Sequence, residues 1–274
     1  TNQGSSSVTA KGFKYFTTPN YGGGWQTVSV GTGLGTFSKT INSLQPNTTY
    51  YISAYATNSF GTAFSNEISF TTSNTPATVT DIDGNIYNTV TIGSQVWMVE
   101  NLKVSKYRDG TSIPNVTDNT QWTNLTTGAY CYYDNNSSFN NTYGKLYNWY
   151  AVDNSKNIAP TGWHVPSDAE WITLYNYLGG QLVAGGTLKS LNLWSSPNTG
   201  ATNSSGFTGI GAGIRFDNTG TFSGTLGQNG DFWSSSVIIS SDKPRGYALS
   251  YNNTYLGQTN DYKARGKSVR CVKD

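Results

Sequence analysis

The fold of the larger part of this chain is decided by one stretch, Pro160-Thr161-Gly162-Trp163-His164-Val165-Pro166-Ser167-Asp168-Ala169-Glu170-Trp171. Ser167 followed three residues later by Glu170 is the signature of a capping box, in which each side chain satisfies an unpaired backbone N–H group of a helix start. The apolar side chains that follow share one helical face: Trp171, Leu174, Tyr175 and Leu178. Gly179-Gly180 ends the pattern. The sequence therefore predicts a helix over about 168–178.

Around this helix the sequence alternates short patterns with loops. Apolar spacing of i, i+3, i+4 and i+7 predicts a second helix over about 142–152, carried by Tyr143, Leu146, Tyr147 and Tyr150. Residues 81–98 contain a Gly turn and a two-strand meander, and Gly and Asn interrupt short apolar runs from Leu188 to Asp274. Two helices, short strands and many loops indicate an α+β domain.

A small polar run that ends in Pro76-Ala77-Thr78 separates this domain from a different pattern, and we place the boundary near Asn74. We therefore expect two domains, 1–74 and 75–274. Upstream, residues 50–56 and 67–71 alternate with a period of two and predict strands. Tyr50 follows a turn, which places its hydroxyl to bond with the preceding backbone as in the tyrosine corner of β-sandwiches.

The first domain resembles the second half of a fibronectin type III domain at positions Leu44, Pro46, Thr48, Tyr50, Ala54, Ala56, Asn58 and Gly61. Such sandwiches have about 100 residues. The resemblance therefore implies a truncated β-sandwich that lacks its first strand and part of its second, within a longer parent chain. A reduced sandwich variant is the alternative explanation.

The second domain carries a set of motifs that occur in one order: Asp83-Gly84-Asn85, Gln95-Val96-Trp97-Met98-Val99-Glu100-Asn101-Leu102, Gly128-Ala129-Tyr130-Cys131, Leu146-Tyr147-Asn148-Trp149, Phe232-Trp233-Ser234-Ser235 and Val269-Arg270-Cys271. Together with the helix start they resemble the major paralogous domain family named after Fibrobacter succinogenes, over about 78–274. That family is similar to the formylglycine-generating-enzyme branch of the C-type lectin-like fold. The resemblance implies two helices, a small twisted antiparallel sheet and neighbouring chain ends.

The composition argues against several classes of function. The net charge is +2 and charged residues make up 12% of the chain, without the clustered basic stripe that nucleic acid requires. The sequence has no apolar run of about 18 residues, so we expect no membrane insertion. The N-terminus lacks the features of a signal peptide, which indicates a mature chain or a fragment. A surface rich in Asn, Ser, Thr, Gly and Tyr is typical of a secreted or cell-surface protein, here a bacterial one.

Few residues are available for catalysis. The only His, His164, precedes the capped helix and is expected to pack or to form hydrogen bonds. Asp168 and Glu170 lie in the first helical turn, where negative charge favours the helix. Formylglycine-generating enzymes use a nearby cysteine pair, whereas Cys131 and Cys271 lie 140 positions apart. We therefore expect no enzyme activity.

Metal and cofactor sites are not expected either. A calcium-dependent sugar site of the C-type lectin kind would need a Trp-Asn-Asp motif, which the sequence lacks. Asp81, Asp83 and Asn85 match the start of an EF-hand loop, but the acid at its twelfth position is missing, so a hairpin turn explains them.

The two cysteines allow one pairing, and an exported protein would favour a disulfide between Cys131 and Cys271. The family resemblance gives an alternative. A Cys often precedes the Pro-Thr-Gly-Trp-His run in that family, and Ala159 holds this place here. Cys271 would then lack its usual partner.

A ligand site is expected near the C-terminus, where aromatic and amide side chains mix as they do in antibody paratopes. The candidates are Asp231, Tyr247, Tyr251, Asn252, Asn253, Tyr255, Asn260 and Tyr262. Exposure is expected above all for the run Tyr251-Asn252-Asn253-Thr254-Tyr255, because buried amides would be stranded without partners. Trp233 is expected in the core.

The leading hypothesis is a non-enzymatic bacterial adhesin-like module that binds a glycan or a surface protein through a lectin-like head behind a fibronectin-like spacer. An enzyme related to formylglycine-generating enzymes, or a carbohydrate-active protein, is the first alternative. A structural stalk component is the second.

Overall fold

The computed structural model divides the chain into two compact units, Thr1–Pro76 and Ala77–Asp274. It describes residues 6–19, 24–41, 44–45, 47–72, 77–223, 225–238 and 242–274. The expected boundary at Asn74 lies outside the described residues, close to the division between the units.

The N-terminal unit is an antiparallel sheet with strand order β2-β1-β3-β4, in which β5 also pairs with β3. Its strands are β1 (Ala10–Phe16), β2 (Gln26–Gly31), β3 (Thr49–Asn58), β4 (Gly61–Phe64) and β5 (Ile68–Thr71). The first half of β3 pairs with β5 and the second half with β4. A sandwich needs two packed sheets, whereas the described strands of this unit pair into one sheet.

The start of β3 carries the hydrogen bond that the sequence predicts for Tyr50. The backbone N–H of Gln45 donates to the Tyr50 hydroxyl over 2.9 Å. Pro46, which the sequence predicts in the turn before Tyr50, lies outside the described residues. The expected hairpin turn joins β3 to β4, and there the Phe60 N–H donates to the Asn58 side chain over 2.9 Å. Local side-chain bonds thus fix both ends of the long strand.

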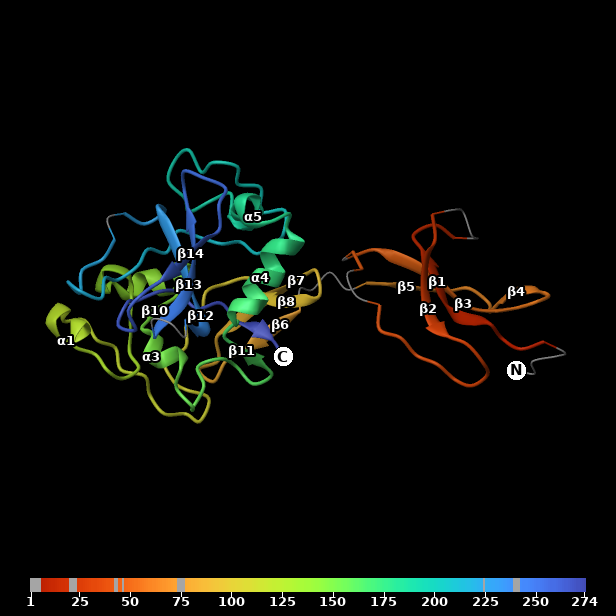
Figure 1. The fold of residues 1–274 in the computed structure, drawn as a ribbon, viewed down its shortest axis with the longest axis horizontal. Helices are drawn as coiled ribbons and strands as arrows, with labels where there is room; N and C mark the ends of the chain where they lie inside the picture. The colour runs from red at the N-terminus through yellow and green to blue at the C-terminus, as the bar shows by residue number, and fades with distance from the viewer. Residues whose placement is uncertain are drawn as a thin grey trace. The chain divides into compact units, whose positions relative to one another are not determined.

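The described residues of the C-terminal unit form three small antiparallel sheets, most of whose strands are labelled in Figure 1. The first has the order β11-β15-β8-β7-β6, the second β12-β13-β14, and the third pairs β9 with β10. Their bounds are β6 (Thr78–Thr80), β7 (Ile86–Ile92), β8 (Gln95–Met98), β9 (Tyr130–Cys131), β10 (Leu146–Tyr147), β11 (Trp163–His164), β12 (Asn229–Ile238), β13 (Lys243–Ser250), β14 (Gly257–Asn260) and β15 (Val272–Lys273). The first and last strands of the unit therefore belong to one sheet. Short strands and a few helices confirm the α+β class.

The predicted capped helix is confirmed as α4 (Asp168–Tyr177). The Ser167 hydroxyl accepts from the Glu170 N–H over 3.3 Å, and the Glu170 carboxylate accepts from the Ser167 N–H over 2.7 Å. Trp171 and Leu174 are buried on the inner face of this helix. The capping box thus orients the helix so that its apolar face meets the core.

The predicted helix over 142–152 is wrong. The segment contains the end of α2 (Asn140–Tyr143), then β10, then α3 (Trp149–Val152). Gly144 breaks the helix with a φ of +74°, and a Cβ at this position would lie 2.9 Å from the carbonyl oxygen of Leu102. Leu146 and Tyr147 pair with β9 instead of continuing the helix. Tertiary pairing therefore overrides the helical spacing.

Helix α5 (Gln181–Leu188) follows α4 directly and was not predicted. Two central glycines, Gly185 and Gly186, lower its intrinsic helix propensity. Their role is tertiary, because a Cβ at Gly185 would lie 2.7 Å from the Thr254 carbonyl oxygen and one at Gly186 would lie 2.5 Å from that of Gly200. The remaining helical elements are short: α1 (Asn119–Thr123), η1 (Tyr133–Asn135) and η2 (Ser137–Phe139).

The core between α4 and the β12-β13-β14 sheet is aromatic. Its ring contacts join Trp97, Trp171, Phe207, Phe232 and Tyr247. Trp171 stacks on Tyr247 with ring centroids 4.8 Å apart. Trp233 is fully buried, as expected, and its indole N–H donates to the Tyr147 carbonyl over 2.8 Å.

We expect Ser167→Ala to lower the free energy of unfolding by about 1 kcal/mol, because the variant loses the N-cap acceptor of α4. Chemical denaturation of the wild type and the variant measures this difference. Thr173→Ala is the matched control, since the Thr173 hydroxyl bonds only to the Ala169 carbonyl within the same helix. Equal losses in both variants would contradict the capping role.

Candidate functional site

The loop between β13 and β14 is organised by a buried lysine. The Lys189 ammonium donates to the carbonyl oxygens of Thr199, Ser250 and Asn253 over 2.9, 2.9 and 2.8 Å. Lys189 is fully buried, and burial lowers its pKa. Because the three carbonyls belong to two separate loops, the Lys189 side chain fixes the backbone path of both loops.

The side chains of this loop point outward from the fixed backbone. Asn252 and Asn253 are exposed, Tyr251 is half-buried and Tyr255 is 40% exposed. The Asn253 side chain accepts from the Tyr255 N–H over 2.9 Å, which makes a turn within the loop. Asn252 accepts from the Ser250 hydroxyl over 2.9 Å. The loop is therefore ordered by its own bonds while Tyr255 stays accessible.

Helix α5 lies beside this loop (Figure 1). The Thr254 hydroxyl donates to the Leu182 carbonyl over 2.8 Å, and the Leu256 N–H donates to the Gln181 carbonyl over 3.0 Å. Leu182 is 73% exposed and Val183 is 48% exposed. We call the combined surface the hairpin-loop face: Leu182, Val183, Tyr251, Asn252, Asn253 and Tyr255.

Two predicted ligand residues lie elsewhere on the surface. Asn260 ends β14 opposite Arg245, three residue pairs along the hairpin from Ala248 and Gly257, which is about 10 Å of strand. Tyr262 follows it and is 61% exposed, with the Lys243 ammonium 4.2 Å from its ring centroid. The structure thus separates this pair from the hairpin-loop face.

The other two predicted ligand residues are not surface residues, and their assignment is corrected. Tyr247 is fully buried in the aromatic core and donates its hydroxyl to Asp168 over 2.6 Å. Asp231 is buried next to Lys267. Burial of the strands explains both errors, because residues 230–234 of β12 are all buried and Tyr247 lies in a largely buried part of β13.

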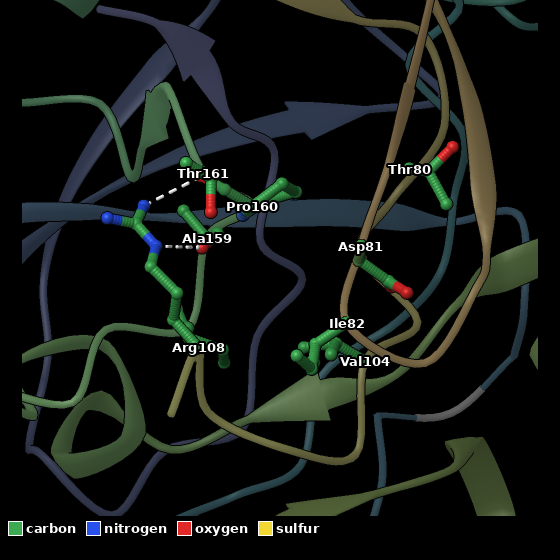
Figure 2. Close-up of a pocket in the computed structure, with 9 residues that line it drawn as sticks. Thr80, Asp81, Ile82, Val104, Arg108, Ala159, Pro160 and Thr161 are labelled. Atoms are coloured by element: carbon green, nitrogen blue, oxygen red, sulfur yellow. Dashed lines mark hydrogen bonds between the residues drawn. The ribbon is translucent and has the colours of Figure 1, made fainter. Parts of the chain in front are cut away.

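The best-formed cavity in the described part of the C-terminal unit has a volume of about 260 Å³ (Figure 2). Arg108 and the loop 159–161 form one wall, and Asp81 with its neighbours lies across from them. Arg108 donates to the carbonyls of Ala159 and Pro160. Asp81 accepts from the hydroxyl of Tyr87 over 2.6 Å and from the backbone of Asp83 and Asn85, which is the hairpin turn predicted there. These charged groups therefore serve the fold.

A second hollow of about 350 Å³ lies over η1 and the segment 221–223. Its lining mixes aromatic, amide and hydroxyl groups: Asn119, Tyr133, Asp134, Asn135, Thr221, Phe222 and Ser223. Asp134 and Asn135 both have positive φ values, 51° and 53°. The Asn119 and Asn135 side chains bond within the domain, to Arg215 and to the Thr117 carbonyl. Nothing in the sequence pattern had singled this hollow out.

His164 lies between two carboxylates. Its Nδ1 is 2.6 Å from Asp274 Oδ1, and its Nε2 is 2.7 Å from Glu170 Oε1. Burial lowers the pKa of His164, but the two carboxylates more than offset this, so its pKa is raised overall. With both ring nitrogens engaged, His164 acts as a structural link between the start of α4 and the C-terminal segment.

The two cysteines are free thiols, so the expected disulfide is wrong. Cys131 packs with Trp122 and Leu146, whereas Cys271 belongs to another cluster that also contains Ala159. That placement agrees with the alternative that Cys271 lacks its usual partner. Burial raises the pKa of Cys131 to about 12 and also raises that of Cys271, so both thiols are protonated and unreactive at neutral pH.

Among the described residues, no three His, Cys, Asp or Glu side chains converge in a way that could hold a metal ion. None of the described helices has the length and apolar character that a membrane span requires.

We expect Lys189→Met to lower the free energy of unfolding by about 3 kcal/mol, because buried carbonyls of both loops lose their donor. Chemical denaturation gives the loss, and hydrogen exchange at the Tyr255 amide should accelerate as the loop loosens. Lys273→Met, the same change at an exposed lysine, is the control. Indistinguishable results for the two variants would contradict the organising role of Lys189.

We also expect stability to depend on the protonation of His164. A raised folded pKa means that the ionised ring stabilises the fold below its ordinary value of about 6.5, and that this stabilisation is lost as pH rises through the folded pKa. Stability should therefore fall as the pH rises above about 6.5 in the wild type and stay flat in His164→Gln. As the chain has one His, NMR titration of its ring protons reports the pKa directly. A value at or below the ordinary one would refute this prediction.

Comparison with known proteins identifies the second unit. The model of the Fibrobacter succinogenes major domain matches residues 90–273. No curated protein and no solved structure matches the chain. The matched segment covers the capped helix, Lys189, the loop that it organises and the three sheets, except for β6 and the first part of β7. Because this segment makes up more than half of the sequence, the chain belongs to the Fibrobacter succinogenes major domain family.

Proposed function

We propose that this chain is a non-enzymatic binding module, secreted or displayed on a bacterial surface, whose hairpin-loop face recognises a protein or a glycan. The observation that carries the proposal is the exposed run of Tyr and Asn side chains on a backbone that Lys189 holds rigid. A rigid loop loses little conformational entropy when it binds, so less of the free energy gained from its contacts is offset. Tyr adds area with few rotatable bonds, and Asn adds adaptable hydrogen bonds.

Details of the hairpin-loop face favour a protein partner. Leu182 and Val183 extend the aromatic and amide surface with aliphatic area, and an interface centre of apolar residues with a polar rim is typical of protein contacts. Within the described residues, the Nδ2 group of Asn252 has no partner and is free to donate. A glycan would use the Tyr and Asn side chains and leave the aliphatic pair unused.

The proposed fold of the head is C-type lectin-like. The capped α4, the small antiparallel sheets and the first and last strands in one sheet support this. The N-terminal unit, with its bond from Gln45 to Tyr50, supports one layer of a fibronectin type III-like spacer. A binding role fits a head behind a spacer by analogy of fold alone.

The alternative of an enzyme has less support. Cys131 and Cys271 are buried in separate clusters, unlike the cysteine pair of formylglycine-generating enzymes. Both nitrogens of His164 are held by carboxylates. A structural stalk component would need neither a rigid loop nor exposed aromatic and amide side chains.

The test is a binding screen of the full chain on a glycan array and against bacterial and host surface proteins. We expect Tyr255→Ala and Asn252→Ala each to weaken binding of the captured partner at least tenfold, since hot-spot residues at the centre of an interface cost about 2 kcal/mol or more when truncated. Leu182→Ala should weaken a protein partner and leave a glycan partner unchanged.

Tyr262→Ala is the matched control, because Tyr262 is at least as exposed but lies at the other end of the hairpin. Binding that depends on Tyr262, or on residues of the second hollow such as Asp134, and survives Tyr255→Ala would rule out the hairpin-loop face.

A further inference from the structure

One buried cation of the C-terminal unit is bonded unlike the others. The Lys267 side chain is fully buried, and its Nζ lies 2.6 Å from Asp261 Oδ2, 2.6 Å from Thr259 Oγ1 and 3.5 Å from Asp231 Oδ2. The ring centroid of Trp233 is 4.7 Å from the same Nζ. The buried Lys189 and Lys145 donate to backbone carbonyls, whereas Lys267 faces two carboxylates in a closed space.

The two carboxylates have different surroundings. Asp261 also pairs with Arg265, and although burial alone would raise its pKa, Lys267, Thr259 and Arg265 lower it overall. Burial raises the pKa of Asp231, and Lys267 offsets this only in part. Asp261 is therefore the ionised partner of the pair, and Asp231 is the one that more readily carries a proton.

The backbone holds the reacting groups together. The Ser268 N–H donates to the Asp231 carbonyl over 2.9 Å, so the neighbour of Lys267 is tied directly to β12. Gly246 leaves room for the lysine, because a Cβ at this position would lie 2.5 Å from Nζ. Groups held within about 3.5 Å in a fixed orientation react as if at very high concentration.

We propose that Lys267 and Asp231 condense to an intramolecular amide bond between Nζ and Cγ. Asp261 accepts a proton from the Lys267 ammonium, and the neutral amine attacks Cγ of the Asp231 carboxylic acid. The new C–N bond forms and the C–OH bond breaks, with the hydroxyl leaving as water after it takes up the second proton of the amine. No oxidation state changes and no co-reactant is needed. The product joins β12 to the C-terminal segment covalently.

The mass of the intact chain tests whether the amide bond forms. Protein that has folded and been incubated at neutral pH is denatured and weighed by mass spectrometry. We expect a mass lower by one water than the sequence requires. A mass equal to that of the sequence would mean that Lys267 and its two carboxylates form an ion cluster only, and would overturn the proposal without any variant.

A tryptic map locates the bond. We expect the peptide 266–270, uncut at Lys267, to be joined to the peptide 216–245, which contains Asp231. Cyclisation of aspartate at Asp83-Gly84 or Asp109-Gly110 also removes one water, but it leaves each of those peptides separate. Water loss confined to these sites would contradict the cross-link.

Variants test the roles of the three residues. Asp231→Asn should give the same bond with loss of ammonia in place of water, because the leaving group is then an amide nitrogen. Lys267→Met should keep the full mass, and Asp261→Asn should slow the condensation at least tenfold. Lys263→Met, at a lysine outside the cluster, should cross-link like the wild type. Ammonia loss in Asp261→Asn but not in Asp231→Asn would place the bond on Asp261 and refute the assignment to Asp231.

Discussion

The structure of the C-terminal unit depends on buried cations whose hydrogen bonds go to backbone carbonyls. Arg215 donates to the carbonyls of Val116, Thr117 and Gly220, and Arg270 donates to those of Met98 and Phe207. Lys189 does the same for another loop, and so does the half-buried Arg108. In strands and helices, backbone carbonyl oxygens accept hydrogen bonds from backbone N–H groups, but those of a loop in the interior need another donor. A Lys or Arg side chain has several donor hydrogens and can bond to three such carbonyl oxygens at once. A unit with short strands thereby keeps a dense interior.

Hydrogen bonds from a buried cation to backbone carbonyls also connect the core to the proposed binding face. Lys189 sits at the end of α5 and holds the β13–β14 loop, while Gly185 lets that loop lie directly on the helix. The same bonds that satisfy the interior leave Tyr255, Asn252 and Leu182 facing outward. Rigidity in the backbone and accessibility in the side chains thus come from one arrangement, which is the property that a preorganised binding surface needs.

Lys267 differs from these cations, because it faces carboxylates and not backbone carbonyls. A buried ammonium between two carboxylates pays a large desolvation cost, which a covalent amide would remove by eliminating both charges. Cys131 and Cys271 do not supply a cross-link, because they lie in different clusters. The proposed amide would give this protein, whose cysteines form no disulfide with each other, a covalent link between β12 and the C-terminal segment.

The sequence by itself determined the features that depend on neighbours in the chain. The capping box at Ser167, the turns at Asp81 and Asn58 and the bond to the Tyr50 hydroxyl all join residues within six positions, so local patterns reveal them. The motif set also determined the family, and the Asn-rich run at 251–255 pointed to an exposed loop.

Only the tertiary structure decided the rest, because long-range pairing competes with local preference. Strand pairing at β10 replaced the helix expected over 142–152, and loop packing made α5 out of a segment with two central glycines. Tyr247 and Asp231 lie on strands whose burial depends on which strands flank them. The burial of Lys189 and Lys267 depends on distant residues, since Lys189 bonds to Asn253, 64 positions away, and Lys267 lies beside Asp231 on β12. A lysine in the sequence is expected at the surface until the fold encloses it.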